Sequence, residues 1–212
     1  FNADGGEVSQ CGNGARCFAR FVREKNLSDK YEIRVDTDAG QLLLIFRDDG
    51  QIAVNMGIPK HQPAEIPLLA DQEALSYWVK VESDEHEIGA VSMGNPHAVI
   101  IVPDVKLAPV ADLGMLLESH ARFPERANIG FMQILDREHI KLRVFERGAA
   151  ETLACGSGAC AAAVIGIQRD LLNHDVHVEL PGGRLKISWA GRGEPVFMTG
   201  PAVSVFEGTI NL

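Results

Sequence analysis

The chain has 212 residues and a formal net charge of −9, from 20 basic and 29 acidic side chains. This acidity argues against nucleic acid and anionic membrane surfaces as partners, and no apolar run of about 18 residues is present that could span a bilayer. The hydrophobic share of 46% is that of one or two globular domains, and four cysteines are too few for a disulfide scaffold, so the thiols are either buried filler or chemically active.

The first half of the chain has the pattern of a helix followed by strands. After Cys11, apolar residues fall at helical spacing and arginines occupy another face. Strand patterns follow at residues 32–36, 41–47, 51–56 and 77–81, and Asp48-Asp49-Gly50 marks a hairpin turn. We place a domain boundary in the polar stretch 84–89, which gives an N-terminal half of residues 1–86 and a C-terminal half of residues 87–212.

The second half has strand patterns on both sides of one apolar helix. The strands are expected at residues 97–102, 130–135, 139–145, 177–180, 184–189, 195–199 and 203–207. Residues 159–167 are apolar on every side, which is typical of a helix buried inside a sheet. Short strands at close spacing favour antiparallel pairing. We therefore predict an α+β fold with two pseudo-symmetric halves, each a curved, mostly antiparallel sheet around a central helix.

An internal repeat relates the two halves. Residues 1–27 and 145–171 align without gaps at an offset of 144, which places Cys11 on Cys155. Strand patterns follow both copies, which argues against chance similarity. Residues from about 87 onward lead into the second copy and have no counterpart before the first. The first half is therefore expected to be N-terminally incomplete, with about sixty residues preceding Phe1.

Cys11 and Cys155 each stand at the start of a predicted helix, before Gly-Asn-Gly and Gly-Ser-Gly. Glycine lets the backbone approach a ligand closely, and the free N–H groups of a helix N-terminus bind anions and favour a thiolate. The alternative is a pair of small buried cysteines, which would not need the glycines. A zinc site fits poorly, because the cysteine spacings are unusual for zinc ligands and no histidine recurs with both copies. Cys17 and Cys160 lie within the helices and are expected in the core.

Two related halves that face each other would place two thiols across one cleft. This arrangement suits the inversion of a carbon centre, in which a base removes a proton from one face and an acid returns a proton to the other. A thiolate and a thiol can exchange these roles between the two directions. Two helix N-termini directed at the neighbouring carboxylate would stabilise the carbanion without a cofactor.

Several motifs taken together are more specific. FNADG, CGNGARC, GNPH, ERANIGF, ACGSGAC, LPGG and MTGPA are spread over the whole chain and resemble the diaminopimelate epimerase family. The resemblance implies a cytoplasmic isomerase, without metal or cofactor, that interconverts LL- and meso-diaminopimelate for lysine and peptidoglycan synthesis. It implies that Cys11 and Cys155 are the two acid/base residues, assisted by His97 and Glu146. It also implies substrate contacts from Asn2, Gly12, Asn13, Asn95, Asn128, Glu146, Arg147, Gly156 and Ser157.

Elementary chemistry fits several of these positions. Arg147 offers a bidentate fork for a distal carboxylate, or else forms a surface ion pair. Glu146 offers an acceptor for an ammonium group, or else is a solvated charge. Asn95 precedes Pro96, so its backbone is held extended. The alternative for Asn95 and for Asn128 is an asparagine that stabilises a turn and does not contact substrate. His97 is either functional or a satisfied core residue.

One departure from the family pattern lies at residues 148–152, which read Gly-Ala-Ala-Glu-Thr where the family has Gly-Ala-Gly-Glu-Thr. If position 150 needs a positive φ, Ala150 is strained. A homodimer is expected from the apolar residues 203–206, a strand edge that needs cover, and because the family often has a tyrosine linked to dimer contacts at position 206.

Two competing interpretations remain. Within enzymes, the competitor is a proline-racemase-like amino-acid racemase, which also works with two cysteines. Outside enzymes, it is a redox-responsive binding protein in which Cys11 and Cys155 form a reversible disulfide.

Overall fold

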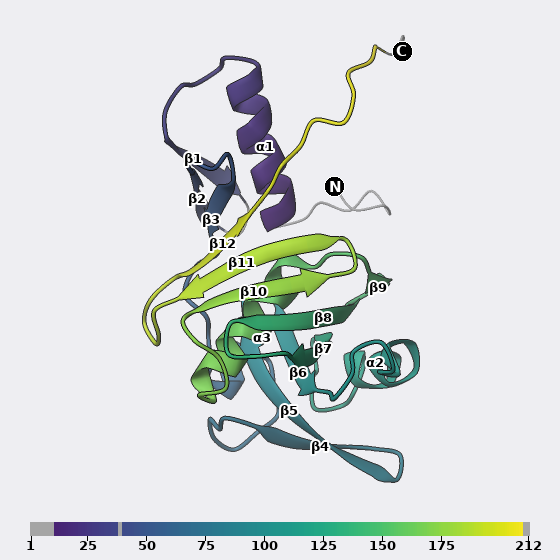
Figure 1. The fold of residues 1–212 in the computed structure, drawn as a ribbon. Coiled ribbons are helices and arrows are strands. Elements are labelled where there is room, and N and C mark those ends of the chain that lie inside the picture. The colour runs from purple at the N-terminus through teal and green to yellow at the C-terminus, as the bar shows by residue number, and fades with distance from the viewer. Residues whose placement is uncertain (1–10, 38–39, 210–212) are drawn as a thin grey trace.

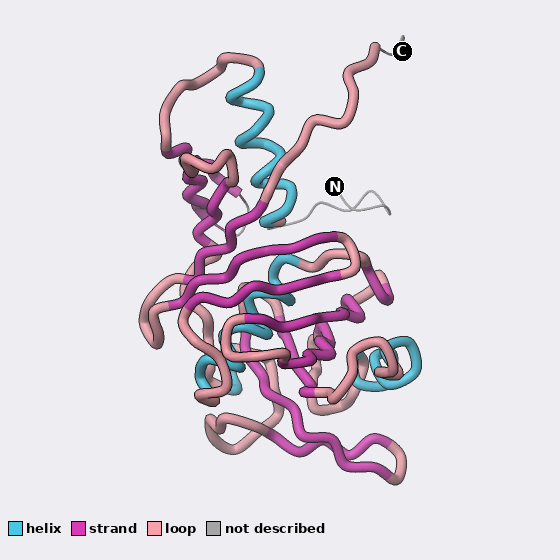
Figure 2. The backbone as a smooth tube through the Cα atoms, in the orientation of Figure 1, coloured by secondary structure: helices cyan, strands magenta, loops and turns pink. Residues whose placement is uncertain are grey.

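The computed structural model describes residues 11–37 and 40–209. Within them, twelve strands form one curved, open sheet (Figure 1, Figure 2). The neighbour order is β1-β2-β3-β12-β11-β10-β8-β7-β6-β5-β4, with β9 paired to β8 off this path. The pairs are antiparallel except β6 with β7 and β8 with β10, which confirms the predicted class and the mostly antiparallel sheet. The strands are β1 (Glu32–Thr37), β2 (Gly40–Phe46), β3 (Ile52–Asn55), β4 (Tyr77–Val81), β5 (Asp84–Ser92), β6 (Pro96–Ile101), β7 (Asn128–Ile134), β8 (His139–Glu146), β9 (Ala150–Thr152), β10 (Asp175–Leu180), β11 (Gly183–Trp189) and β12 (Val196–Gly200).

Two helices of equal length lie against the sheet in different ways. The second of them, α3 (Gly156–Gln168), is enclosed by strands from β5 to β12, and every residue from Gly158 to Gly166 is buried. The first, α1 (Gly12–Glu24), packs mainly on β2 and β3 and buries only four residues. This difference follows from sequence, because α3 is apolar all round whereas α1 carries charged residues such as Arg20 and Glu24 on its outer side, although Arg16, expected on that face, is buried.

The 144-residue repeat is a structural symmetry. At this offset α1 matches α3, and β1, β2 and β3 match β10, β11 and β12. The last strands of the two sets, β3 and β12, pair antiparallel with each other, and Val54 lies opposite its own repeat partner, Met198. An antiparallel pair is related by a local two-fold rotation, so the pseudo-two-fold axis of the chain passes between these two residues.

Two apolar clusters fill the fold. The larger surrounds α3 and extends to the inner sides of β2, β3 and β10–β12. The smaller lies between β4–β7 and α2 (Val110–Glu118), with Ile66 just after the 3₁₀ helix η1 (Pro63–Glu65). Each fully buried Val, Leu or Ile side chain contributes about 1.5–3 kcal/mol. No helix within the described residues is long and apolar enough to cross a membrane.

Two expectations from the sequence need correction. The polar stretch 84–89 is not a break between strands but the first part of β5, whose early residues are polar because they face solvent. Residues 203–207 form no strand, and Val203, Val205 and Phe206 are exposed. This apolar segment pairs with no strand of the described residues and runs beside α1 instead, with Lys25 paired to Glu207 (Figure 1).

Helix α1 also departs from expectation on its outer side. Cys17 is exposed rather than buried, as are Phe18 and Phe21, because they point away from β2 and β3. Cys160, at an enclosed position of α3, is fully buried as expected. The predicted core position is therefore confirmed for Cys160 in α3, which is surrounded by strands, and wrong for Cys17 in α1, which is covered on one side only.

Candidate active site

Cys11 and Cys155 are the N-cap residues of α1 and α3, each with extended backbone. The Gly14 N–H donates to the Sγ of Cys11 over 3.4 Å, and Cys11 is exposed. The residues directly after the two cysteines, Gly12 and Gly156, leave no room for a side chain. A Cβ at Gly12 would lie 2.3 Å from the Met198 side chain, and one at Gly156 would lie 3.0 Å from its sulfur. Met198 therefore touches the first turns of both helices, which meet beside the pseudo-two-fold axis.

Asn13 lies where the two helix starts approach each other. Its Oδ1 would be 3.3 Å from a Cβ at Gly156 and accepts a 2.9 Å hydrogen bond from the guanidinium of Arg16. Arg16 is buried and also donates to the carbonyl of Pro201, and burial lowers its pKa. The structure thus brings Gly12, Asn13 and Gly156 together.

The surroundings of Cys155 keep its thiol protonated. Its Sγ donates to Glu146 over 3.0 Å, and the Ser157 hydroxyl lies 3.7 Å away. Burial, and then the Glu146 charge, raise the pKa of the Cys155 thiol well above its usual range. The Thr152 hydroxyl donates to the other oxygen of Glu146 and so fixes its orientation.

Hydrogen bonds hold the remaining candidates in two sets, one between His97 and Asn95 and one around Asn128. His97 is fully buried, and its Nε2 donates to the Oδ1 of Asn95 over 3.0 Å, since an amide oxygen can only accept. Burial, and then the nearby charge of Arg147, lower the pKa of His97 to about 3, so the ring is neutral. The buried amide of Asn128 donates to the carbonyl of Pro96 (3.1 Å) and accepts from the N–H of Arg147 (3.0 Å).

These contacts place two groups of candidates in the fold. Cys11 with Gly12 and Asn13 lies at the start of α1, next to the start of α3. The second group is held around the ends of β6, β7 and β8 and the start of α3, and comprises Asn95, His97, Asn128, Glu146, Arg147, Cys155, Gly156 and Ser157. Asn2 lies outside the described residues.

Sequence reasoning missed two residues of this region, namely Thr152 and Glu118, whose side chain accepts from the N–H of Gly148, the residue after Arg147. Thr152 follows the noticed Glu151 and carried no signal of its own. Glu118 ends α2, a helix that the sequence shows only through apolar residues spaced three and four apart, at 110, 113 and 117. The suspected strain at Ala150 is confirmed, since its φ is +59°.

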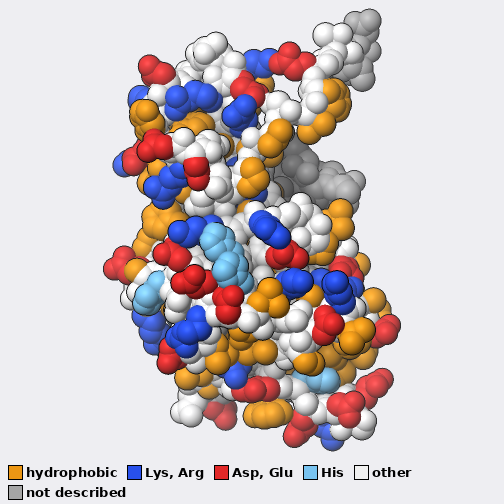
Figure 3. Space-filling view, in the orientation of Figure 1, with side chains coloured by type: hydrophobic (Ala, Val, Ile, Leu, Met, Phe, Trp, Pro, Cys, Tyr) orange, Lys and Arg blue, Asp and Glu red, His pale blue; other side chains and the backbone are white. Residues whose placement is uncertain are grey.

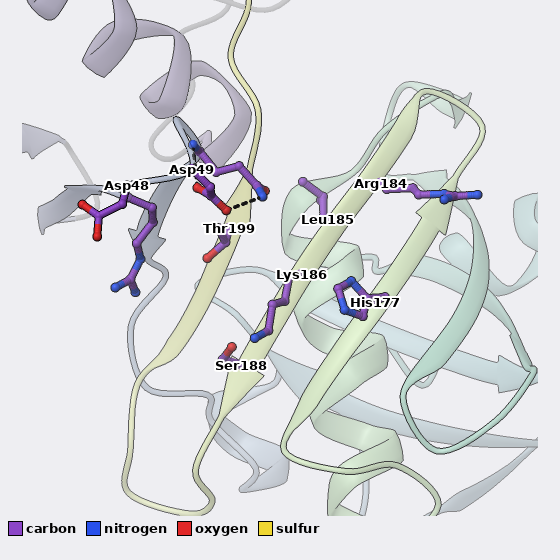
Figure 4. Close-up of a pocket in the computed structure, with 10 residues that line it drawn as sticks. Asp48, Asp49, His177, Arg184, Leu185, Lys186, Ser188 and Thr199 are labelled. Atoms are coloured by element: carbon purple, nitrogen blue, oxygen red, sulfur yellow. Dashed lines mark hydrogen bonds between the residues drawn. The ribbon is translucent and has the colours of Figure 1, made fainter.

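A depression of the described surface lies elsewhere. It measures about 680 Å³ and runs between the hairpin turn at Asp48 and Asp49 and the outer side of β10–β12, where His177, Lys186 and Thr199 face it (Figure 4). This side of the sheet carries interspersed acidic, basic and histidine side chains (Figure 3). None of the candidate residues that the structure describes lines the depression. Among the described residues, no group of three His, Cys, Asp or Glu side chains is placed to bind a metal.

Comparison with known proteins gives consistent results. The family model of diaminopimelate epimerase matches residues 1–62 and 89–205. The diaminopimelate epimerase of Nitrosomonas europaea is 60% identical over all 212 residues, which span 77% of that protein, and that of Pseudomonas entomophila is 58% identical over the same shares.

Solved structures with similar folds have low identity. A hydroxyproline epimerase from Agrobacterium vitis superposes with a TM-score of 0.67 at 16% identity, over 91% of this chain and 65% of that one. A PhzF-family phenazine biosynthesis protein from Bacillus anthracis gives a TM-score of 0.64 at 17% identity, over 96% and 77% of the two chains. Such low identities show the shared fold alone.

Proposed function

The chain belongs to the diaminopimelate epimerase family and is an isomerase, and we propose that it interconverts LL- and meso-diaminopimelate with Cys11 and Cys155 as a two-base pair. The thiolate of one cysteine removes the proton from the Cα of the substrate. The thiol of the other delivers its own proton to the opposite face, so the configuration inverts and the two sulfurs exchange protonation states. The reverse reaction uses the same residues in exchanged roles. The product serves lysine and peptidoglycan synthesis.

The observation that carries this proposal is the different hydrogen bonding of the two sulfurs. Cys155 donates its proton to Glu146, whereas the Sγ of Cys11 accepts a backbone N–H at a helix N-terminus. This supports a resting enzyme with Cys155 as the acid and Cys11 as the base. The sequence repeat aligns Glu146 with Asn2, so the carboxylate that keeps Cys155 protonated corresponds to a neutral amide in the first half.

The helix starts support the handling of negative charge. When the proton leaves Cα, charge moves onto the neighbouring carboxylate, and preorganised N–H groups lower the barrier to that step. The first turns of α1 and α3 approach each other at Asn13 and Gly156, so free N–H groups of both helices lie in one region. We assign the reacting carboxylate to this region.

The distal end of the substrate is assigned to Asn95, Asn128 and Arg147 of the second group, whereas Cys155 and Gly156 of that group lie at the reacting end. Arg147 provides a fork for the distal carboxylate, and the amides of Asn95 and Asn128 supply further polar partners. His97 is neutral and buried next to Arg147, which supports a role in holding Asn95 rather than a role as an acid at neutral pH. Cytoplasmic location and a homodimer remain expectations.

Exchange of the substrate Cα proton tests the proposal. LL-diaminopimelate is incubated with the full-length protein in D₂O, and configuration and deuterium content are followed by NMR. We expect inversion with incorporation of solvent deuterium, and a loss of at least a hundredfold in Cys11→Ser and in Cys155→Ser, because serine is a far poorer base. Cys17→Ser, a change at an exposed cysteine outside the site, is the matched control.

Elimination of HX from a halogenated substrate analogue needs only one base, so it is expected to survive in one direction in a single mutant. Substantial epimerase activity in Cys11→Ser or Cys155→Ser would refute the two-thiol mechanism. Turnover of proline in place of diaminopimelate would favour the racemase interpretation. An oxidant-dependent change of binding without turnover would favour the redox-responsive one.

A further inference from the structure

One buried carboxylate lies outside the residues assigned to the reaction. Glu118 is the last residue of α2, and its side chain is only 3% exposed. A carboxylate removed from water is costly unless charged or hydrogen-bonding groups surround it. The partners that Glu118 has in place of water therefore indicate what it does.

Those partners belong to two turns of the chain, one at Arg126 and one at Gly148. The Gly148 N–H donates to its Oε1 over 3.1 Å, and the Nε of Arg126 donates to its Oε2 over 3.0 Å, with a second guanidinium nitrogen on Oε1. Its backbone carbonyl accepts from the N–H of Ala127. One residue thus binds the chain just before β7 and the chain just after β8.

Each of these turns precedes or follows a residue assigned to the substrate. Gly148 directly follows Arg147, and Arg126 comes two residues before Asn128. The two turns are also joined directly, because the Arg147 N–H donates to the Oδ1 of Asn128 and the Arg147 guanidinium donates to the carbonyl of Glu125 (2.9 Å).

The turns need such support. Arg126 has a φ of +60°, a left-handed conformation that is unfavourable for a residue with a Cβ, and Gly148 has a φ of +74°. A strained backbone keeps one conformation only where its surroundings over-determine it. At Arg126 the ion pair to Glu118 and the adjacent Ala127 hydrogen bond supply that support.

We infer that Glu118, through Arg126 and the N–H of Gly148, is a positioning residue that aligns Arg147 and Asn128 for the distal end of the substrate. This inference rests on the proposed function. It predicts that the loss of the Glu118 charge weakens substrate binding in the ground state and the transition state equally, because the chemistry takes place at the other end of the substrate. Such a loss raises KM and leaves kcat nearly unchanged.

Two variants test the inference. Glu118→Gln removes the charge at nearly constant volume, and Arg126→Gln removes its partner, whose side chain is half exposed and tolerates replacement. Glu87→Gln is the matched control, since it breaks a Glu–Arg ion pair, to Arg169, at the far end of α3. KM and kcat for LL-diaminopimelate are measured, together with amide exchange at Gly148 by NMR.

We expect KM to rise at least fivefold in both variants with kcat within threefold of wild type, and Gly148 exchange to accelerate at least fivefold relative to amides of α3. The control should change none of these values. A role in stability alone would instead lower the active fraction, so that kcat falls and KM stays constant, and this result overturns the inference.

If Glu118→Gln does not fold, Arg126→Gln decides by the same criteria. If the full-length wild-type protein does not turn over diaminopimelate, the proposed function fails. Unchanged Gly148 exchange in the folded variants would then overturn the inference independently.

Discussion

The buried ring of His97 should make the protein sensitive to acid. The folded chain holds the pKa of His97 at about 3, first because burial removes the ring from water and second because Arg147 is close. In the unfolded chain the ring titrates at its usual value of about 6.5. Between these two pH values His97 is protonated in the unfolded chain and neutral in the folded chain. Acidification therefore favours unfolding, and the stability present above pH 6.5 is lost as the pH falls toward 3.

The size of this effect follows from the two pKa values. Each pH unit in the window changes the free energy of unfolding by about 1.4 kcal/mol, and the change from pH 7 to pH 4 amounts to about 3 kcal/mol. This is a large part of the stability of an ordinary domain, about 5–15 kcal/mol. Carboxylates with lowered pKa, such as those of Asp136 and Asp175, act in the same direction, so a comparison of variants is needed to isolate His97.

The assay is urea unfolding at pH 7 and pH 4 for wild type and His97→Gln. Glutamine keeps a donor for the Oδ1 of Asn95 and does not titrate in this range. We expect His97→Gln to be less stable than wild type at pH 7 and to lose about 3 kcal/mol less on acidification. A difference between the two chains below about 1 kcal/mol would refute the assignment of a neutral, desolvated ring. His61→Gln is a useful comparison, since burial lowers the pKa of His61 to about 4 outside the site.

Three further predictions concern backbone, core and thiol. Ala150→Gly should stabilise the protein by about 0.5–1 kcal/mol, because the strain energy released at φ +59° exceeds the entropy that glycine adds to the unfolded chain. The change is measured as a higher Tm, and a lower Tm would contradict it. Gly89→Ala should destabilise by about 1–3 kcal/mol in urea unfolding, since its Cβ would lie 2.3 Å from Ile165 of α3, whereas Gly208→Ala should be neutral. Glu146→Gln should lower the pKa of the Cys155 thiol, measured as thiolate absorbance against pH. The signal of Cys155 is identified because it disappears when Cys155→Ser is added. An unchanged titration would show that burial alone raises this pKa.

The sequence predicted well those elements that depend on local pattern. The strand at Tyr77–Val81 was predicted at its observed bounds, and the repeat located α1 and α3 because apolar periodicity and glycine-rich starts are both local signals. Helix α2 was missed because it has nine residues, no side-chain cap hydrogen bond and a glycine in its interior. Residues 203–207 have a strand pattern but no neighbouring strand, and a strand exists only where its backbone groups are paired.

The candidate site divides in the same way. The two cysteines and their glycines were found from motifs, because a helix N-terminus has a signature in sequence. The difference between the two thiols was not found, since the contact between Glu146 and Cys155 depends on how β8 lies beside α3. The role of Glu118 was hidden for the same reason: its partners Arg126 and Gly148 belong to two separate turns that only the fold brings together.

The pairing of β3 with β12 about the axis at Val54 and Met198 has the geometry of an isologous contact, the self-complementary interface through which identical subunits form dimers. Two identical subunits in that arrangement would present two equivalent thiols, and neither would be singled out to hold the proton. Here both copies belong to one polypeptide, so each can vary alone. The repeat sets Arg16 opposite Cys160 and Asn2 opposite Glu146. Covalent linkage of the two copies is thus what would allow a nearly symmetric framework to carry the proposed unsymmetric pair of acid and base.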